Sequence, residues 1–180
     1  MTAYRVERVN PVRGAPASFV DPLGPLWRVE LAGQLPIPDA PFIGTTGHLV
    51  YTDAATRAEL VAVSAAEKGP HAVLIPICKS SEWWALSQDA RQAYLDGSRA
   101  TGHVAIGRNH AARIYRRLYH ARYLPGSQWD FLTYFEFEGS DVGRFEELLT
   151  ALRDPAQNPE WTFVDRETEI WLTRISTRQI

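Results

Sequence analysis

The chain has 180 residues, of which 45% are hydrophobic and 22% charged, and its formal net charge is −2. This composition supports one or two compact domains and excludes a disordered or collagen-like chain. The small net charge gives no sign of a nucleic-acid or acidic-membrane partner, and no apolar run approaches the roughly 18 residues that span a bilayer. Residues 1–8 lack the apolar core of a secretory signal, so we expect a cytoplasmic protein.

The N-terminal part of the chain, residues 1–70, predicts an irregular arm, two strands and one helix. Four prolines and weak periodicity make residues 1–25 the irregular arm. The helix is rich in Ala, begins after an Asp suited to an N-cap and ends at a Lys-Gly-Pro sequence. The two strands and the helix are predicted over residues 26–31, 42–51 and 54–66.

The C-terminal part, residues 71–180, predicts strands and helices in the order β-α-β-β-α-β. Its first strand, residues 71–79, is apolar almost throughout, as in a strand buried on both faces, while Pro76 indicates a sheet edge or a bulge. A long helix over residues 88–108 contains two glycines that weaken it. The other predicted elements are strands over residues 114–123, 131–137 and 161–175, and a helix capped by Ser140 before the last strand.

This order of elements is that of the ferredoxin-like split β-α-β unit. The β-β-α segment before it forms a second, incomplete copy, although no sequence repeat or clear linker separates the two. We therefore predict an α+β fold of the ferredoxin-like, dimeric α+β barrel type. It has a shortened N-terminal unit over residues 1–70 and a complete C-terminal unit over residues 71–180, joined in one compact structure.

The chemistry-bearing residues are few, because the sequence has no phosphate-binding glycine loop, no Cys/His metal spacing and no nucleophile elbow. Each histidine has an ordinary structural explanation, such as sheet packing or, for His103, an interaction with the C-terminal end of a helix. Arg116 and Arg117 are adjacent in a strand and point to opposite faces. Arg116 shares its face with Ile114 and Leu118, so it is either ion-paired or awaits an anionic ligand. The five histidines are His48, His71, His103, His110 and His120.

Four strings of the C-terminal part occur together in a recognisable order. They are LIPICKS at 74–80 with Trp83 and Trp84 just after it, RRLYH at 116–120, DFLTYFE at 130–136 and EWTFV at 160–164. In this order and spacing they resemble the chlorite dismutase family, over about residues 71–175, whereas the N-terminal part matches weakly. The short chain is similar to the compact lineage of that family, whose members are dimers.

The resemblance implies that the C-terminal unit binds heme b. In the family the axial histidine stands thirteen residues before an arginine, which itself stands four residues before the histidine of the Leu-Tyr-His string. In this sequence those positions are His103, the implied iron ligand, and Arg116, the implied catalytic residue. The other implied cofactor-binding residues are Glu160 as the acid beside the axial ligand, Lys79 near the heme propionates, and Trp83 and Trp84 close to the heme.

The implied reaction converts chlorite to chloride and dioxygen, by oxygen-atom transfer to ferric heme and formation of the O–O bond. Arg116 would attract chlorite and retain hypochlorite, because a guanidinium stays charged at any working pH. A hydrogen bond from His103 to Glu160 would give the ligand imidazolate character. The resemblance thus implies a small anionic substrate and a homodimer, with neither nucleic acid nor membrane as partner.

Two positions depart from relatives of this family. Ser64 stands where some short-lineage members carry a glutamine that positions the arginine, so we expect a more mobile Arg116. Ile75 stands where one type of coproheme decarboxylase carries a tyrosine, which argues against that activity. Two alternatives stay open: a heme peroxidase, and a non-enzymatic protein that binds or handles heme.

Sulfur is scarce in this sequence, since Met1 and Cys78 carry its only two sulfur atoms. Codon bias explains this most simply, because Lys68 and Lys79 are the only lysines among 19 basic residues. Handling of a strong oxidant is the second explanation, since Met and Cys oxidise first. On that hypothesis Cys78, next to Lys79, is the first place to look for oxidative damage.

Overall fold

The computed structural model describes residues 2–15, 26–29, 42, 44, 54–56, 58, 69–96, 99–110 and 113–175. Most of the predicted strand over 42–51 and most of the predicted helix over 54–66 lie outside these residues, as do His48 and Ser64. Among the described residues, no helix combines the length and the apolar character that crossing a bilayer requires.

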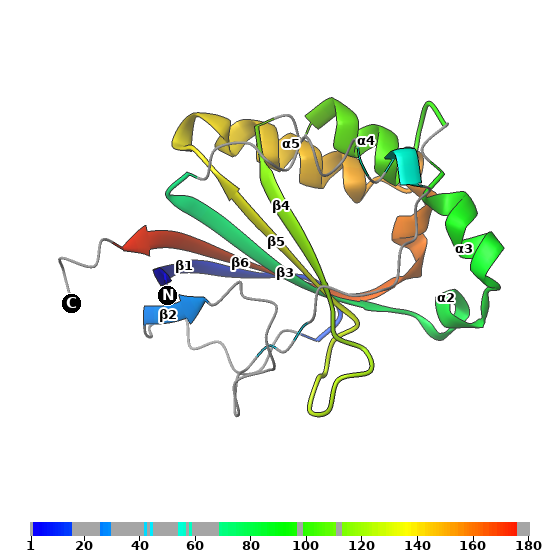
Figure 1. The fold of residues 1–180 in the computed structure, drawn as a ribbon, viewed down its shortest axis with the longest axis horizontal. Coiled ribbons are helices and arrows are strands. Elements are labelled where there is room, and N and C mark those ends of the chain that lie inside the picture. The colour runs from blue at the N-terminus through cyan, green and yellow to red at the C-terminus, as the bar shows by residue number, and fades with distance from the viewer. Residues whose placement is uncertain are drawn as a thin grey trace.

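One antiparallel sheet of six strands carries the fold, in the order β2-β1-β6-β3-β5-β4 (Figure 1). The last four strands lie side by side in the order β6-β3-β5-β4, and all pairs are antiparallel. If these four strands are numbered 1 to 4 along the chain, their spatial order is 4-1-3-2, which is the arrangement of a ferredoxin-like unit. The predicted α+β fold is therefore confirmed. The strands are β1 (Thr2–Arg13), β2 (Leu26–Val29), β3 (His71–Lys79), β4 (Tyr115–His120), β5 (Phe131–Phe137) and β6 (Val164–Ile175).

The N-terminal strand β1 shows that the prediction of an irregular arm was wrong. Tyr4 and Val6 are buried and alternate with exposed residues, and β1 pairs with β6 as far as Arg13. Pro11 is accommodated near the end of the strand, where the register shifts before Arg13. The described N-terminal strands thus extend the sheet of the C-terminal unit, and the division at residue 70 stays a prediction.

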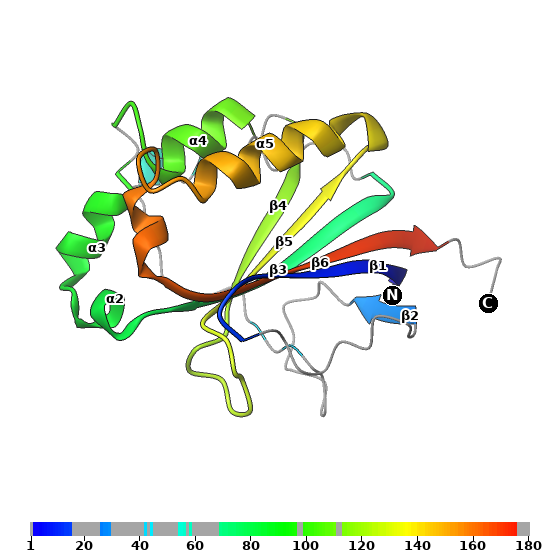
Figure 2. The same ribbon diagram turned by 180° about the vertical axis from the view of Figure 1, so that it is seen from behind.

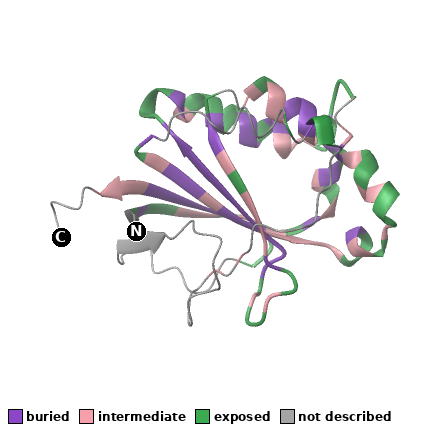
Figure 3. Ribbon diagram, in the orientation of Figure 1, coloured by how far each residue is buried: buried purple, intermediate pink, exposed green. Residues whose placement is uncertain are grey.

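Helices α4 (His103–His110) and α5 (Val142–Leu152) lie side by side over one face of the sheet (Figures 1 and 2). The helical spacing predicted for α5 is confirmed, because Phe145 and Leu148 are buried against the strands beneath. Figure 3 shows the buried residues along the strands and along parts of α4 and α5. The principal core side chains are Val73, Ile75, Phe135, Phe137, Phe145, Leu148 and Trp171.

The long helix predicted over residues 88–108 is two shorter helices, α3 (Gln88–Tyr94) and α4. Gly102, directly before α4, has φ +98°, a conformation that glycine adopts without a steric cost. Another short helix, α2 (Ser81–Ala85), precedes α3. This break places His103 at the start of a helix. The prediction that His103 lies near the end of a long helix was therefore wrong.

Two further boundaries differ from the prediction. The last strand does not begin at Trp161, because Pro159–Phe163 form the 3₁₀ helix η2 and β6 begins at Val164. A second 3₁₀ helix, η1 (Gly139–Asp141), precedes α5. The sheet edge indicated by Pro76 is also wrong, because β3 lies between β5 and β6; a register shift occurs instead between Cys78 and Lys79.

Candidate active site

The helix-facing side of the sheet extends beyond the core toward the short helix α2. Phe135 packs on Phe145 of α5, with ring centres 5.0 Å apart, and so identifies this face on β5. Arg116 of edge strand β4 pairs with Phe135, and Leu118 and His120 follow on the same face. All three β4 side chains are only partly buried. A basic and partly apolar strip therefore lines this part of the sheet.

His103 and Glu160 meet above this strip. His103 is the first residue of α4, and Glu160 lies in η2, directly before β6. Nδ1 of His103 lies 2.8 Å from Oε2 of Glu160, and this buried oxygen has no other hydrogen-bond partner among the described residues. The side chain of His103 is 26% exposed, so part of the imidazole remains accessible.

Lys79, the last residue of β3, holds the other oxygen of the same carboxylate. Its Nζ donates to Oε1 of Glu160 at 2.7 Å, and both side chains are more than nine-tenths buried. Burial raises the pKa of the Glu160 carboxyl, but the Lys79 ammonium and the N–H groups that His103 and Lys79 direct at the carboxylate lower it more, so the pKa lies well below its ordinary value. Glu160 is therefore an ionised acceptor, with Lys79 on one oxygen and His103 on the other.

Arg116 faces the second nitrogen of the same imidazole. Its Nη2 lies 3.5 Å from Nε2 of His103, and no described acid forms an ion pair with it. Burial lowers the pKa of Arg116, and the negative charge of Glu160 opposes this. Because a carboxylate only accepts, we assign the imidazole proton to Nδ1 and the lone pair to Nε2. The structure thus favours the anion-binding alternative for Arg116 over a structural ion pair.

Trp83 closes the site on the side of α2. It is 1% exposed and packs against Tyr94 and Phe163, with ring centres 5.8 and 5.5 Å away. The ammonium of Lys79 lies 4.8 Å from its ring centre, within reach of a cation–π contact. Its buried Nε1 has no acceptor among the described residues. A buried donor without an acceptor is costly, so this group is suited to a polar ligand.

Trp84 points to a different partner, Asp130, whose role the sequence analysis missed. Asp130 is 7% exposed and accepts from Trp84 Nε1 at 3.1 Å, from the backbone N–H of Lys79 at 2.7 Å and from Arg122 at 2.7 Å. The Arg122 guanidinium also lies 3.9 Å from the Trp84 ring centre. One sequence signal was available: Asp130 directly precedes the apolar strand β5, where an acid is buried only with several donors.

Cys78 lies on the opposite face of the sheet from Glu160 and His103. Its side chain packs with Trp129 and Leu132, whereas the next residue, Lys79, faces the helices. The thiol donates to the carbonyl of Gln128 at 3.3 Å. Adjacent strand residues point to opposite faces. Nearness to Lys79 in the sequence therefore does not place Cys78 at the site.

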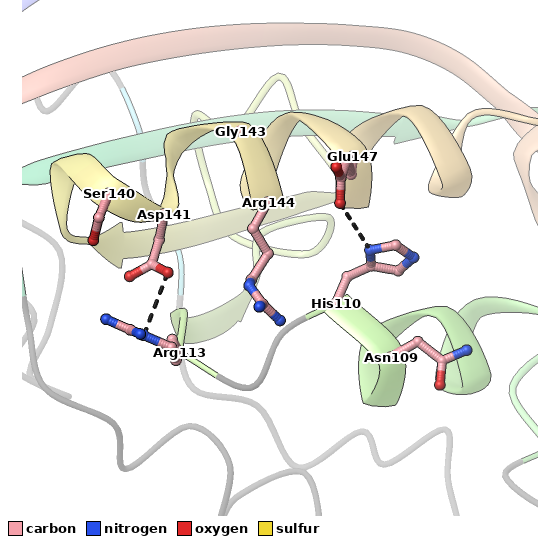
Figure 4. Close-up of a pocket in the computed structure, with 8 residues that line it drawn as sticks. All are labelled: Asn109, His110, Arg113, Ser140, Asp141, Gly143, Arg144 and Glu147. Atoms are coloured by element: carbon pink, nitrogen blue, oxygen red, sulfur yellow. Dashed lines mark ion pairs between the residues drawn. The ribbon is translucent and has the colours of Figure 1, made fainter.

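The other described histidines have structural contacts. His71 stacks on Phe137, and His120 meets the edge of Phe131. His110, at the far end of α4 from His103, lies 4.0 Å from Glu147. It borders a separate polar cleft of about 500 Å³ between α4 and α5, where Arg113 pairs with Asp141 at 3.3 Å (Figure 4). This cleft does not include any residue of the His103 site.

The fold and these contacts define a ferredoxin-like protein with a histidine anchored on a buried carboxylate. The model of the chlorite dismutase family matches residues 32–173, and the chain therefore belongs to the chlorite dismutase family. The crystal structure of dimeric chlorite dismutases from Nitrobacter winogradskyi is similar, with a TM-score of 0.76 and 30% identity over 97% of this chain and 100% of that chain.

Longer relatives match over part of their length. A chlorite dismutase from Candidatus Nitrospira defluvii in complex with imidazole has a TM-score of 0.61 and 28% identity, over 76% of this chain and 54% of that chain. A chlorite dismutase from Ideonella dechloratans is 30% identical over 87 residues, which is 48% of this chain. The chain thus matches only 27% of the length of that curated relative.

Proposed function

We propose that this protein binds heme b and converts chlorite to chloride and dioxygen. The observation that carries the proposal is the position of the His103 imidazole. One of its nitrogens is anchored on an ionised carboxylate, and the other faces the guanidinium of Arg116, which has no described acidic partner. Membership of the chlorite dismutase family supports the same chemistry.

The residues of the site fit a heme group on two observations. Nε2 of His103 keeps a lone pair, because Glu160 holds the proton-bearing Nδ1, and a neutral imidazole nitrogen is a common axial ligand of heme iron. The buried Nε1–H of Trp83 lacks an acceptor among the described residues, as expected of a donor that faces the polar edge of a bound group. His103 would hold the iron, and Trp83 and Trp84 would border the group.

When bound, heme supplies an iron that exchanges an oxygen atom with the substrate. Glu160 keeps the proton of His103 on Nδ1 and so keeps Nε2 available as a ligand. Lys79 neutralises part of the Glu160 charge, which limits how much electron density the carboxylate passes to the imidazole. We had predicted Lys79 near the heme propionates. Its contact with Glu160 supports a role beside the axial ligand His103.

Arg116 is the residue that would bind the anion. Its guanidinium is partly buried on the edge strand β4 and faces His103 Nε2, the nitrogen that would bind the iron. A guanidinium remains charged even where burial lowers its pKa. It would attract chlorite, fix its orientation by hydrogen bonds and retain hypochlorite until dioxygen forms.

The alternatives differ in what they require of Arg116. A protein that only binds or handles heme would use His103, Glu160 and Trp83, but it would leave the guanidinium without a task. A coproheme decarboxylase of the tyrosine type is disfavoured, because Ile75 is 3% exposed and packs in the core. A peroxidase would need the same heme and remains the second enzymatic candidate.

An oxygen electrode decides among these functions. Chlorite added to the heme-loaded protein should release dioxygen rapidly, and the release should fall sharply in Arg116→Ala while heme remains bound. Heme binding without dioxygen release would favour the heme-handling alternative. Loss of heme in His103→Ala tests the ligand assignment separately.

We also propose a homodimer located in the cytoplasm. The match to the dimeric Nitrobacter winogradskyi structure, over 97% of this chain and all of that chain, supports the dimer. Sedimentation of the purified protein tests it. The cytoplasmic location stays a prediction.

A further inference from the structure

Tyr123 stands out because it is a large aromatic side chain that the fold does not bury. It is 77% exposed and is the only exposed large apolar side chain in the part of the chain that the structure describes. It lies in the turn between β4 and β5, which projects from the sheet in Figures 1 and 2. Packing therefore does not explain a tyrosine at this position.

A single guanidinium links Tyr123 to the candidate active site. The Cζ atom of Arg122 lies 3.9 Å from the ring centre of Trp84 and 5.8 Å from that of Tyr123. Trp84 follows Trp83, whose ring lies beside the Lys79 ammonium. Trp84 is thus adjacent in the chain to a tryptophan of the buried site, and the Arg122 guanidinium lies between its ring and that of Tyr123 at the surface.

The environments of the two tryptophans differ in how well they support loss of an electron. An oxidised indole is positively charged and readily loses its Nε1 proton. The Lys79 ammonium lies 4.8 Å from the Trp83 ring centre and is paired with Glu160, but Nε1–H of Trp83 has no described acceptor that could take its proton, so oxidation of Trp83 is disfavoured. Trp84 has two guanidiniums near its ring, Arg122 and Arg91 at 3.9 and 5.7 Å from the ring centre, but it donates Nε1–H to the Asp130 carboxylate, which pairs with Arg122 and can take the indole proton. Oxidising equivalents should therefore favour Trp84 over Trp83.

We propose that Trp84 and Tyr123 form an electron-transfer route, through which the protein oxidises bulky phenols or aryl amines at its surface. This inference rests on the proposed heme chemistry. Hydrogen peroxide is the oxidant: it takes two electrons and two protons and gives two water molecules. Two reductant molecules each lose one electron to Tyr123 and release one proton to solvent. Reductants too large to reach His103 are thus accepted at the turn.

The test compares three variants of the heme-loaded protein: Tyr123→Phe, Trp84→Phe and the control Tyr94→Phe. Tyr94 is a partly buried tyrosine that packs against Trp83 but does not lead to the surface turn. Each protein receives hydrogen peroxide and a nitroso spin trap, and tandem mass spectrometry locates the adduct. We expect the adduct on Tyr123 in the wild type and in Tyr94→Phe, and its loss in Tyr123→Phe and Trp84→Phe.

Two further measurements complete the experiment. Oxidation of a bulky aryl amine dye by peroxide should fall severalfold in Tyr123→Phe, whereas dioxygen release from chlorite should not change in that variant. In the heme-free protein, a photogenerated ruthenium(III) oxidant should produce an indole radical that decays to a tyrosyl radical, and the indole signal should persist in Tyr123→Phe.

The outcomes separate this inference from the proposed function. Normal dioxygen release with no adduct on Tyr123, or with dye oxidation unchanged in Tyr123→Phe, overturns the route and leaves the proposed function intact. A wild-type protein that binds no heme overturns the proposed function and the surface activity together. An equal loss of adduct in Tyr94→Phe would show that the route does not run through Trp84 and Tyr123.

Discussion

Nη2 of Arg116 lies 3.5 Å from Nε2 of His103, the imidazole nitrogen that does not face Glu160. A cation held against a neutral nitrogen, with no described acid beside it, is available to an anion that enters the site. The electrostatic attraction is strong because burial reduces the screening by water.

The first prediction concerns Arg116. Arg116→Ala should lower dioxygen release from chlorite at least about tenfold, the loss expected when a hydrogen bond to a charged group is removed. Heme content, measured by absorbance, should not change, because His103 and Glu160 are intact. Arg116→Lys keeps the charge but not the planar donors, so it should fall between the wild type and Arg116→Ala. Equal activity in all three proteins would remove Arg116 from the mechanism.

The second prediction concerns the carboxylate that joins His103 to Lys79. Glu160→Gln should weaken heme binding by roughly 10–100-fold, as found when an acid beside a metal-bound histidine is lost. It should also lower the free energy of unfolding by about 3–5 kcal/mol, because it leaves the buried Lys79 ammonium unpaired. Heme titration and urea unfolding measure the two effects.

A double variant is the matched control for that stability loss. Glu160→Leu with Lys79→Met removes both charges and should recover most of the stability, since an apolar pair of similar volume replaces a buried ion pair at little cost. It should not recover heme binding. Recovery of heme binding in the double variant would contradict the role assigned to Glu160.

The third prediction is a pH dependence of stability. The pKa of Glu160 is lower in the folded chain than in the unfolded chain, so the unfolded chain binds more protons in acid. The stabilisation from Glu160 is therefore complete above the ordinary pKa of a glutamate and is lost as the pH falls toward the folded pKa. The slope reaches at most about 1.4 kcal/mol per pH unit for one proton. Urea unfolding of the heme-free protein from neutral to acid pH measures it.

Glu167 provides a control of opposite sign. Burial raises its pKa, although the nearby Arg153 charge opposes the effect. Its contribution to stability is therefore lost as the pH rises through its folded pKa. Glu160→Gln should flatten the loss of stability in acid, whereas Glu167→Gln should leave that loss in place. A steep acid dependence that survives in Glu160→Gln would refute the assignment.

The sequence predicted the C-terminal strands well because their patterns are local. The apolar run at 71–79 and the alternating strand at 131–137 have the predicted bounds, and the α5 periodicity fits its buried face. The β1 strand was missed because Pro11 and the three prolines that follow the strand concealed the alternation of Tyr4 and Val6, which only pairing with β6 makes significant. Propensity alone does not report such long-range pairing.

The site was predictable by resemblance but not in its contacts. His103, Glu160 and Lys79 do come together, yet the break at Gly102 that places His103 at a helix start depends on the packing of neighbouring segments. Asp130 was missed because two of its three donors, Lys79 and Trp84, lie 51 and 46 residues before it in the chain. Cys78 is next to Lys79 in the sequence, but its side chain points to the opposite face of the sheet and therefore lies away from the site.

The last prediction returns to that cysteine. Burial raises the pKa of the Cys78 thiol, and the opposing charge of Arg166 does not offset this. Because the thiolate is the reactive form, Cys78 should be oxidised slowly despite being the only cysteine. Tandem mass spectrometry after turnover with chlorite should find Cys78 unmodified while Trp84 or Tyr123 is oxidised. A fixed dose of hypochlorite should leave Cys78 unmodified in the folded protein and oxidise it after unfolding in sodium dodecyl sulfate, where the thiol is exposed. Sulfinic acid at Cys78 in the folded protein, before any aromatic oxidation, would show that the strand does not protect it.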